Sequence, residues 1–412
     1  MNAVQPKVHP TPRQSPHLLE EAAKGLERKR ELGQFFTPPE VAGFMWDLLE
    51  VIRGRRFPAS TRLIDPACGE GAFLRVAQER GGLAARCLFG ADIDETLASG
   101  WREDPLLRGA NLLLANGLLD NPQASIAEGT FNVVVGNPPF SGKGLRDLAR
   151  LLEDSEEGAP HQEHDFFEVR HLEAAAKPRP PLSHPARAEL DRLVRTLSRY
   201  ACWRLETEMQ PDDEAGAEAE SGATELFAAA ALFDRGRPTT SDYERASQLI
   251  AQWPADRPLD LSRSEVRDTI RRLAGTAIEV MFTERFLRLA GPSGLIAVIV
   301  PESIVASDRL GPFRIWLLGR MDLLASVSLP PKVFAGVGAN AKTSIIFARR
   351  RTQDRPDGWY SPDALDDLPD EDRPIFLAAP RLDAPGYTIG SYLERVLADA
   401  RREREEFWSD AE

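Results

Sequence analysis

The 412-residue sequence has few cysteines, no long apolar run and no excess of positive charge. Only Cys68, Cys87 and Cys202 occur, and an odd number at wide spacing argues against a disulfide framework or a four-cysteine zinc site. A reducing cytoplasm suits such a chain. The longest apolar runs, 226–233 and 295–300, are far shorter than the roughly 18 residues of a membrane-spanning helix. The first residues contain no apolar stretch typical of a signal peptide.

Charge and composition narrow the class of protein to which the chain can belong. The 64 acidic residues exceed the 51 basic ones, which gives a net charge of −13 and excludes a protein coated in positive charge. A basic cleft on an acidic body, or a basic partner chain, stays compatible with this balance. With 42% hydrophobic and 28% charged residues, the chain reads as a soluble globular protein of two or three domains.

Short apolar runs alternate with helical patterns in two separate parts of the chain. We expect strands at 62–64, 87–91, 112–115, 131–135, 295–300, 324–329 and 344–348. We expect helices at 41–52, 72–80, 278–290, 313–318 and 391–408. Strands this apolar suit a parallel sheet that is buried on both faces, so the sequence predicts a doubly wound α/β domain.

The alternation is interrupted once, which predicts the domain boundaries. Residues 1–30 form an N-terminal tail, 31–140 and 276–350 the two halves of the α/β domain, and 351–412 a C-terminal extension. Residues 141–275 form a largely helical insertion with a helix at 186–206 and an acidic loop at 211–222.

Two motifs at predicted strand ends suit a nucleoside cofactor. Residues 65–73 (DPACGEGAF) join a strand to a helix, and Gly69 and Gly71 permit a tight turn and close backbone approach. The alternative is an ordinary strand–helix turn. Asp92 ends the next strand, where an acidic side chain accepts ribose hydroxyls, while Asp94 suits a helix N-cap.

The most specific signal is residues 136–140 (GNPPF), again at a strand end. The prolines fix the backbone, and the Asn137 side-chain oxygen with the Pro138 carbonyl can accept both protons of a planar amino group. Phe140 offers a face on which a flat base can stack. The alternative is a rigid Pro-Pro turn without catalytic meaning.

Together these motifs resemble the adenine-N6 DNA methyltransferases that use S-adenosylmethionine (SAM). Residues 33–41 (GQFFTPPEV) match their N-terminal cofactor motif, 65–73 their glycine motif and 136–140 their catalytic motif. Residues 331–345 (PKVFAGVGANAKTSI) resemble the late motif of modification subunits of type I restriction systems. The motif order is that of the γ group. The resemblance implies a Rossmann-like SAM-dependent methyltransferase domain and covers roughly residues 31–140 and 276–350.

The resemblance also implies a role for each matching residue. Asn137, Pro138, Pro139 and Phe140 would be catalytic, and Phe140 and Phe334 would stack on a target base that is flipped out of the duplex. Asn116 stands where this family often has an aspartate that reads the cofactor's adenine. The residues implied to bind SAM are Phe36, Thr37, Asp65, Ala67, Gly69, Gly71, Asp92, Ile93 and Asn116.

From the resemblance we expect an adenine-specific DNA methyltransferase of a bacterial restriction or phage-defence system, cytoplasmic and associated with the nucleoid when bound to DNA. The expected partners are DNA, a separate specificity subunit and a nuclease. A specificity subunit is expected because few residues follow the late motif. The insertion is the other candidate for recognition of the target sequence. Two alternatives stay open. One is an N-methyltransferase acting on protein glutamine or RNA guanine, and the other is a non-catalytic subunit that binds SAM or DNA.

Two further clusters lie in the predicted insertion. His161, Glu163, His164 and His171 lack a known ligand spacing, so we expect no metal site there. Five arginines recur on one predicted helix and fit either a phosphate track or a solvated face, and the interspersed acidic residues favour the solvated face; they are Arg187, Arg192, Arg195, Arg199 and Arg204.

Overall fold

The computed structural model describes residues 37–140, 145, 148–152, 183–205, 240–330, 333–334, 342–356, 374–380 and 388–409. The predictions for residues 1–30, Phe36, the acidic loop at 211–222 and the histidine cluster at 161–171 lie outside this part of the chain. Within it, no helix has the length and apolar character needed to cross a membrane.

The described strands form one eight-stranded sheet in the order β3-β2-β1-β4-β5-β7-β6-β8. All neighbouring pairs are parallel except β5–β7 and β6–β7, which are antiparallel. The bounds are β1 Leu63–Asp65, β2 Leu88–Asp92, β3 Asn111–Leu114, β4 Phe131–Gly136, β5 Ala290–Pro301, β6 Met321–Leu329, β7 Thr343–Arg350 and β8 Phe376–Ala378. The α/β class and the doubly wound sheet predicted from the sequence are confirmed.

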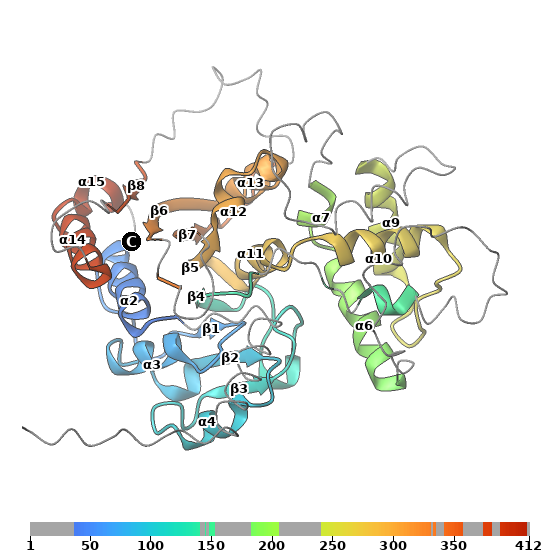
Figure 1. Cartoon of the computed structure of the whole chain (residues 1–412), viewed down its shortest axis with the longest axis horizontal. Helices are drawn as coiled ribbons and strands as arrows, with labels where there is room; N and C mark the ends of the chain where they lie inside the picture. Colours follow the sequence, from blue (N-terminus) through green and yellow to red (C-terminus); the bar gives the residue numbers. More distant parts are fainter. Residues whose placement is uncertain are drawn as a thin grey trace, which may run out of the picture.

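Helices cover both faces of the sheet (Figure 1). The first half of the domain contributes α2 Pro39–Arg53, α3 Ala72–Glu79 and α4 Leu97–Glu103, with the 3₁₀ helices η1 Ala85–Cys87 and η2 Pro122–Ala124. The insertion contributes α6 His184–Leu197, α7 Cys202–Leu205, α9 Thr240–Gln252 and α10 Ser264–Gly275. The rest are α11 Ile278–Leu289, α12 Glu302–Ala306, η5 Asp308–Leu310, α13 Gly311–Leu318, α14 Ile389–Arg402 and α15 Arg404–Trp408.

Two apolar clusters hold these layers together. One unites α2, α3 and α14 with the side chains on one face of the strands, such as Leu63, Val133 and Ile299. The other unites α6, α10 and α11 with the opposite face, where Ile64 and Val134 point. Because strand side chains alternate between faces, adjacent residues serve different clusters and both faces are buried.

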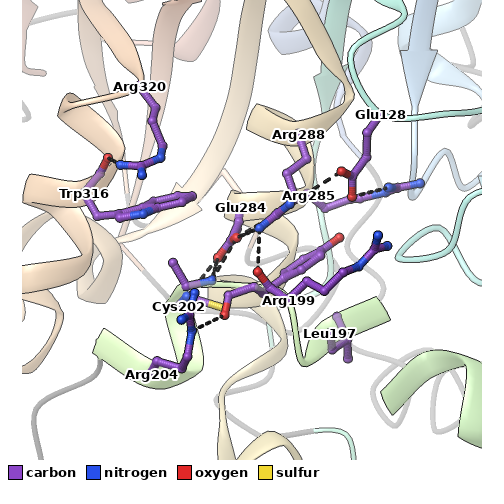
Figure 2. Close-up of polar contacts among 12 residues, drawn as sticks. Glu128, Leu197, Arg199, Cys202, Arg204, Glu284, Arg285, Arg288, Trp316 and Arg320 are labelled. Atoms are coloured by element: carbon purple, nitrogen blue, oxygen red, sulfur yellow. Dashed lines mark hydrogen bonds and ion pairs between the residues drawn. The ribbon is translucent and has the colours of Figure 1, made fainter. Parts of the chain in front are cut away.

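The insertion is tied to α11 by a buried polar network (Figure 2). Glu284 is fully buried and accepts backbone N–H bonds from Ala201 and Cys202 at the start of α7, at 2.8–2.9 Å. Arg288, one turn later, pairs with Glu284 at 2.8 Å and donates to the Arg199 backbone oxygen at 2.8 Å. The carboxylate therefore satisfies backbone donors that a helix start leaves without partners.

Three predicted boundaries differ from the structure. Strand β5 begins at Ala290 and includes residues 291–294, whereas the sequence predicted a helix up to residue 290 and a strand only from residue 295. The two glycines there allow close backbone approach: a Cβ on Gly291 would lie 2.9 Å from the Gly129 oxygen. The helix predicted at 391–408 is divided at Glu403, and the one predicted at 186–206 is divided into α6 and α7.

After residue 350 the described chain stays on the α/β domain. Strand β8 extends the sheet by pairing with β6, and Phe376 packs against Trp408 of α15. The Tyr392 hydroxyl of α14 donates to the Ser328 backbone oxygen at 2.9 Å. The segment predicted as a C-terminal extension thus supplies a strand and a covering helix to the same sheet.

Candidate active site at the carboxyl edge of the sheet

The strand order reverses direction between β1 and β4, which lie side by side. In open α/β sheets, ligands bind at such a switch point, beyond the carboxyl ends of the strands. Asp65 ends β1, and Asn137 follows the last residue of β4. A Cβ on Gly136 would lie 2.6 Å from the Asp65 Oδ1 atom, so the two motifs predicted for cofactor and target meet here.

The glycine motif makes a tight turn into α3. Gly69 and Gly71 both adopt the left-handed region, with φ of 51° and 86°, where glycine has no steric cost. The turn is fixed by backbone bonds from Gly71 N to Cys68 O, at 2.8 Å, and from Cys68 N to Ala91 O, at 3.0 Å. Cys68 is buried against Gly90, which suits a packing role.

Asp65 is 1% exposed and accepts a backbone bond from Ala67 N at 3.0 Å. Burial raises the pKa of this carboxyl to about 8; the Ala67 bond opposes the rise and the nearby Asp92 charge adds to it. A carboxyl with this pKa carries its proton for part of the time near neutral pH. A cation placed beside it would favour the ionised form.

Asp92 links the ends of β1 and β2. Its two oxygens accept backbone bonds from Gly69 N, at 2.9 Å, and Asp94 N, at 3.0 Å. Burial raises the pKa of Asp92, and these bonds oppose the rise. Asp92 is the last residue of β2, where a carboxylate can meet ribose hydroxyls. The adjacent Ile93 leaves 58% of its surface exposed.

Two neighbouring residues support this turn and were not singled out from the sequence. The Trp101 Nε1 atom of α4 donates to the Gly69 carbonyl at 2.8 Å. The N-cap of α4 is Thr96 rather than Asp94, and Asp94 instead accepts bonds from the Thr96 N–H and hydroxyl. The only sequence signal for Trp101 is a large aromatic in a surface helix.

The loop after β3 carries Asn116 and is held from two sides. The Asn116 side-chain oxygen accepts the Leu118 N–H at 3.0 Å, and it keeps one further lone pair. Gly117 approaches the Pro66 backbone so closely that a Cβ would lie 1.7 Å from its oxygen. Arg285 of α11, with its side chain fully buried, donates to Gly117 O at 2.9 Å and to Leu119 O at 2.9 Å.

Arg285 was missed by sequence analysis, because nothing in its helix distinguishes it from the arginine three residues later. It also pairs with Asp120 at 2.8 Å. Three bonds from one rigid guanidinium therefore fix the loop that brings Asn116 to the carboxyl edge of the sheet.

The predicted catalytic motif lies in extended backbone directly after β4. The Asn137 side-chain oxygen and Pro138 are buried, whereas Pro139 is half-buried. Phe140 and Phe334 are both buried and meet edge to face, with ring centroids 6.2 Å apart at 77°. A base stacked between two rings needs about 7 Å between parallel planes, so the rings must turn and separate to admit one.

Two other residues predicted to bind the cofactor, Ala67 and Thr37, are among those that the structure describes. Ala67, half-buried, follows Pro66 in the glycine motif. Thr37 is half-buried and precedes Pro38, which caps α2. The structure thus brings the ends of β1, β2 and β4 together, with the loop after β3 held against Pro66.

The sheet order, with its switch point between β1 and β4, defines a Rossmann-like α/β fold, and the candidate site lies at that switch point. Residues 17–179 match a protein-family model described as N-6 DNA Methylase. The match includes the glycine motif and residues 136–140, so the resemblance seen in the sequence is confirmed over this segment.

Known proteins with sequence or structural similarity include restriction–modification enzymes. The chain is 32% identical to the Type II methyltransferase M.TthHB8I of Thermus thermophilus over 113 aligned residues. The aligned segment is 27% of this chain and 22% of that protein. The chain therefore spans about a fifth of the length of this curated relative.

Solved structures match at lower identity. A Listeria monocytogenes protein provisionally assigned to the class I SAM-dependent methyltransferases has 15% identity and a TM-score of 0.43, with 93% of this chain and 78% of that chain covered. The methyltransferase subunit of a type I restriction–modification system from Streptococcus thermophilus has 16% identity and a TM-score of 0.37, with 77% and 45% covered.

Proposed function

We propose that this protein transfers a methyl group from SAM to the N6 amino group of adenine in DNA, as the modification component of a restriction or phage-defence system. The observation that carries the proposal is the meeting of two motifs at the switch point: Gly136 leaves no room for a side chain beside Asp65, so the Asn-Pro-Pro-Phe motif directly adjoins the glycine motif.

The described residues fit SAM. The carboxyl of Asp65 and the carboxylate of Asp92 suit the positive charges of this cofactor, and Asp92, at the end of β2, stands where an acidic side chain meets ribose hydroxyls in such folds. Exposed Ile93 offers an apolar surface for the adenine, and Asn116 follows the adjacent strand β3. Gly69 and Gly71 allow close backbone approach to the methionine end. When bound, SAM supplies a methyl group activated by a sulfonium.

The chain's own contribution is to hold and orient the amino group. The lone pair of an adenine amino nitrogen is delocalised into the ring, which makes it a poor nucleophile. Hydrogen bonds from the amino group to Asn137 Oδ1 and the Pro138 carbonyl would draw electron density onto the nitrogen and orient its lone pair toward the methyl donor. The nitrogen would gain the methyl group, release one proton to water and leave the sulfonium as a neutral thioether. These acceptors are fixed before the reaction, which is the source of electrostatic catalysis in buried sites. Positioning of the two reactants contributes up to about 7–11 kcal/mol in ideal cases.

The target base must leave the duplex to reach this site. Extrusion costs a few kcal/mol, and stacking on aromatic side chains offsets part of it, at about 1–3 kcal/mol per base. Phe140 and Phe334 are the aromatic residues beside Asn137, and their edge-to-face contact must open for stacking. The same contact shields both rings from water when no base is present.

Target recognition would come from a partner specificity chain or from the insertion, with a nuclease as a further partner. We place the protein in the bacterial cytoplasm, on the nucleoid when it is bound to DNA.

The decisive experiment replaces the proposed amino-group acceptor. Purified full-length chain, alone and with the products of its neighbouring genes, is incubated with labelled SAM and plasmid DNA, and nucleosides are identified by mass spectrometry. We expect N6-methyladenine from the wild type and none from Asn137→Ala, with SAM binding retained.

The matched control is Asn132→Ala, four residues before the motif's Gly136 on the same strand, where an exposed side chain accepts the Arg62 N–H at 2.9 Å. This variant should keep its activity. Undiminished adenine methylation by Asn137→Ala contradicts the proposal, and methylated guanine or glutamine instead of adenine would reassign the substrate.

A further inference from the structure

A shallow hollow lies between α6 and the end of α9. One wall carries Arg192 and Arg195 of α6 together with Arg199, which lies in the turn after the helix, and the opposite wall carries Trp253 with Ile250. Arg192 and Arg195 are three residues apart and so lie on the same face of α6. Among the described residues no carboxylate lines this hollow, which we call the arginine hollow.

The three guanidiniums differ in how they are held. Arg195 is fixed, because it donates to the backbone oxygens of Trp253, at 2.9 Å, and Arg257, at 2.5 Å. Arg192 and Arg199 are exposed, and within the described chain their side chains form no ion pair or hydrogen bond. By contrast, Arg187 on the same helix pairs with Asp191 at 3.4 Å.

This arrangement is unusual for the chain as a whole. The protein has a net charge of −13, yet residues 183–205 contain five arginines against two acidic residues. The fixed position of Arg195 keeps a third positive charge beside the two uncompensated ones. Guanidiniums that gather without carboxylates favour an anionic ligand with several oxygens, and their planar fork matches phosphate.

The spacing of the helical arginines can be compared with that of phosphates. Arg192 and Arg195 are separated by about 4.5 Å of rise along α6, at 1.5 Å per residue, and Arg199 lies two residues beyond the end of the helix. Phosphates along one strand of duplex DNA are separated by about 3.4 Å of axial rise, so the two helical arginines suit neighbouring phosphates. Trp253 adds a flat apolar wall, with the Arg263 guanidinium 5.2 Å from its ring centroid.

We infer that the arginine hollow binds the phosphodiester backbone of duplex DNA at a site separate from the pocket for the target base. This inference rests on the proposed DNA methyltransferase function and extends it, since it gives the insertion a sequence-independent role in holding the substrate. Phosphate contacts of this kind position a protein on the duplex without reading its sequence.

The test uses the full-length double variant Arg192→Gln/Arg199→Gln. Binding of a labelled duplex is measured by fluorescence anisotropy between about 50 and 200 mM salt. Loss of two phosphate contacts should flatten the slope of log K against log salt by about 1.8 and weaken binding about 10–100-fold at the lower salt. The loss should be the same for any duplex sequence. SAM affinity and the melting temperature should equal those of the wild type.

The matched control is Arg395→Gln/Arg401→Gln, which removes the same charge from exposed positions of α14, on the opposite face of the sheet. It should change the slope and affinity far less. Equal effects of the two double variants would show that only net charge matters and would overturn the inference.

A second arm separates DNA from free phosphate. If inorganic phosphate binds the wild type and not Arg192→Gln/Arg199→Gln, while duplex binding is the same for both, the hollow is a small-anion site and the inference is wrong. Failure of the proposed function is distinguishable, because Asn137→Ala tests methyl transfer and leaves the salt dependence of DNA binding unchanged.

Discussion

The buried carboxyl of Asp65 makes stability depend on pH in a direction that can be measured. Its pKa rises from the ordinary value of 3.8 to about 8 in the folded protein. Between these values the folded state binds more protons than the unfolded state, so the free energy of unfolding falls as pH rises. Below the unfolded pKa the stabilisation is complete, and it is lost as pH passes through about 8. At about 1.36 kcal/mol per pH unit, the total effect is at most about 6 kcal/mol.

The Asp65→Asn variant removes this titration but keeps a side-chain oxygen that can accept the Ala67 N–H. In the wild type this N–H lies 3.0 Å from the Asp65 oxygen. Urea unfolding without SAM, at about pH 5.5 and about pH 8.5, gives the free energies of both proteins. From about pH 5.5 to about pH 8.5, the free energy of unfolding of the wild type should fall by about 3 kcal/mol more than that of the variant. An unchanged difference would refute the argument that burial holds this carboxyl partly protonated. SAM should bind the wild type more tightly as pH rises towards 8, because its positive charge favours the ionised form.

Substitutions at four other positions test the site. Gly117→Ala should cost about 1–3 kcal/mol of unfolding free energy, because its Cβ meets the Pro66 backbone. Arg285→Met should cost about 2–5 kcal/mol in urea titrations by leaving two buried carbonyls unpaired, and Arg285→Lys should recover part of it. Trp101→Phe should lower the free energy of unfolding by about 1 kcal/mol and weaken SAM binding in calorimetry. Equal SAM affinity of the variant and the wild type would show that the Trp101 indole does not support the cofactor turn. Phe334→Ala should cost about 3–5 kcal/mol and raise the KM for DNA, and an unchanged KM would remove Phe334 from the base pocket.

The strands of the sheet were predictable because most are short, wholly apolar and followed by residues that chemistry requires. The runs before Asp65, Asp92 and Asn137 are buried on both faces, so their composition alone distinguishes them from surface strands. Strand β8 was not predictable, because only three residues pair and Leu377 is largely exposed. The extended start of β5 was missed because its glycines have the local signature of a turn, and only pairing with β4 reveals their role.

The candidate site was predictable where local sequence and function coincide. Gly69, Gly71 and Asp92 are within one strand–helix–strand unit, from β1 through α3 to β2, so they lie close in sequence and in space. The loop clamp by Arg285 depends on a contact between residues 168 positions apart, which no periodicity encodes. The closed pair of Phe140 and Phe334 is likewise a contact between residues far apart in the chain, and the sequence gives only the two aromatics.

The same long-range clamp has a consequence for synthesis on the ribosome. The loop after β3 emerges well before Arg285, whose guanidinium fixes Gly117 across 168 positions of chain. At about 5–20 residues per second, translation of the intervening segment takes roughly 8–34 s. During that interval the nascent protein holds the glycine turn but lacks the arginine that secures its neighbouring loop. The loop after β3 therefore reaches its final, clamped position only after α11 has been made, so the carboxyl edge of the sheet is completed late in synthesis.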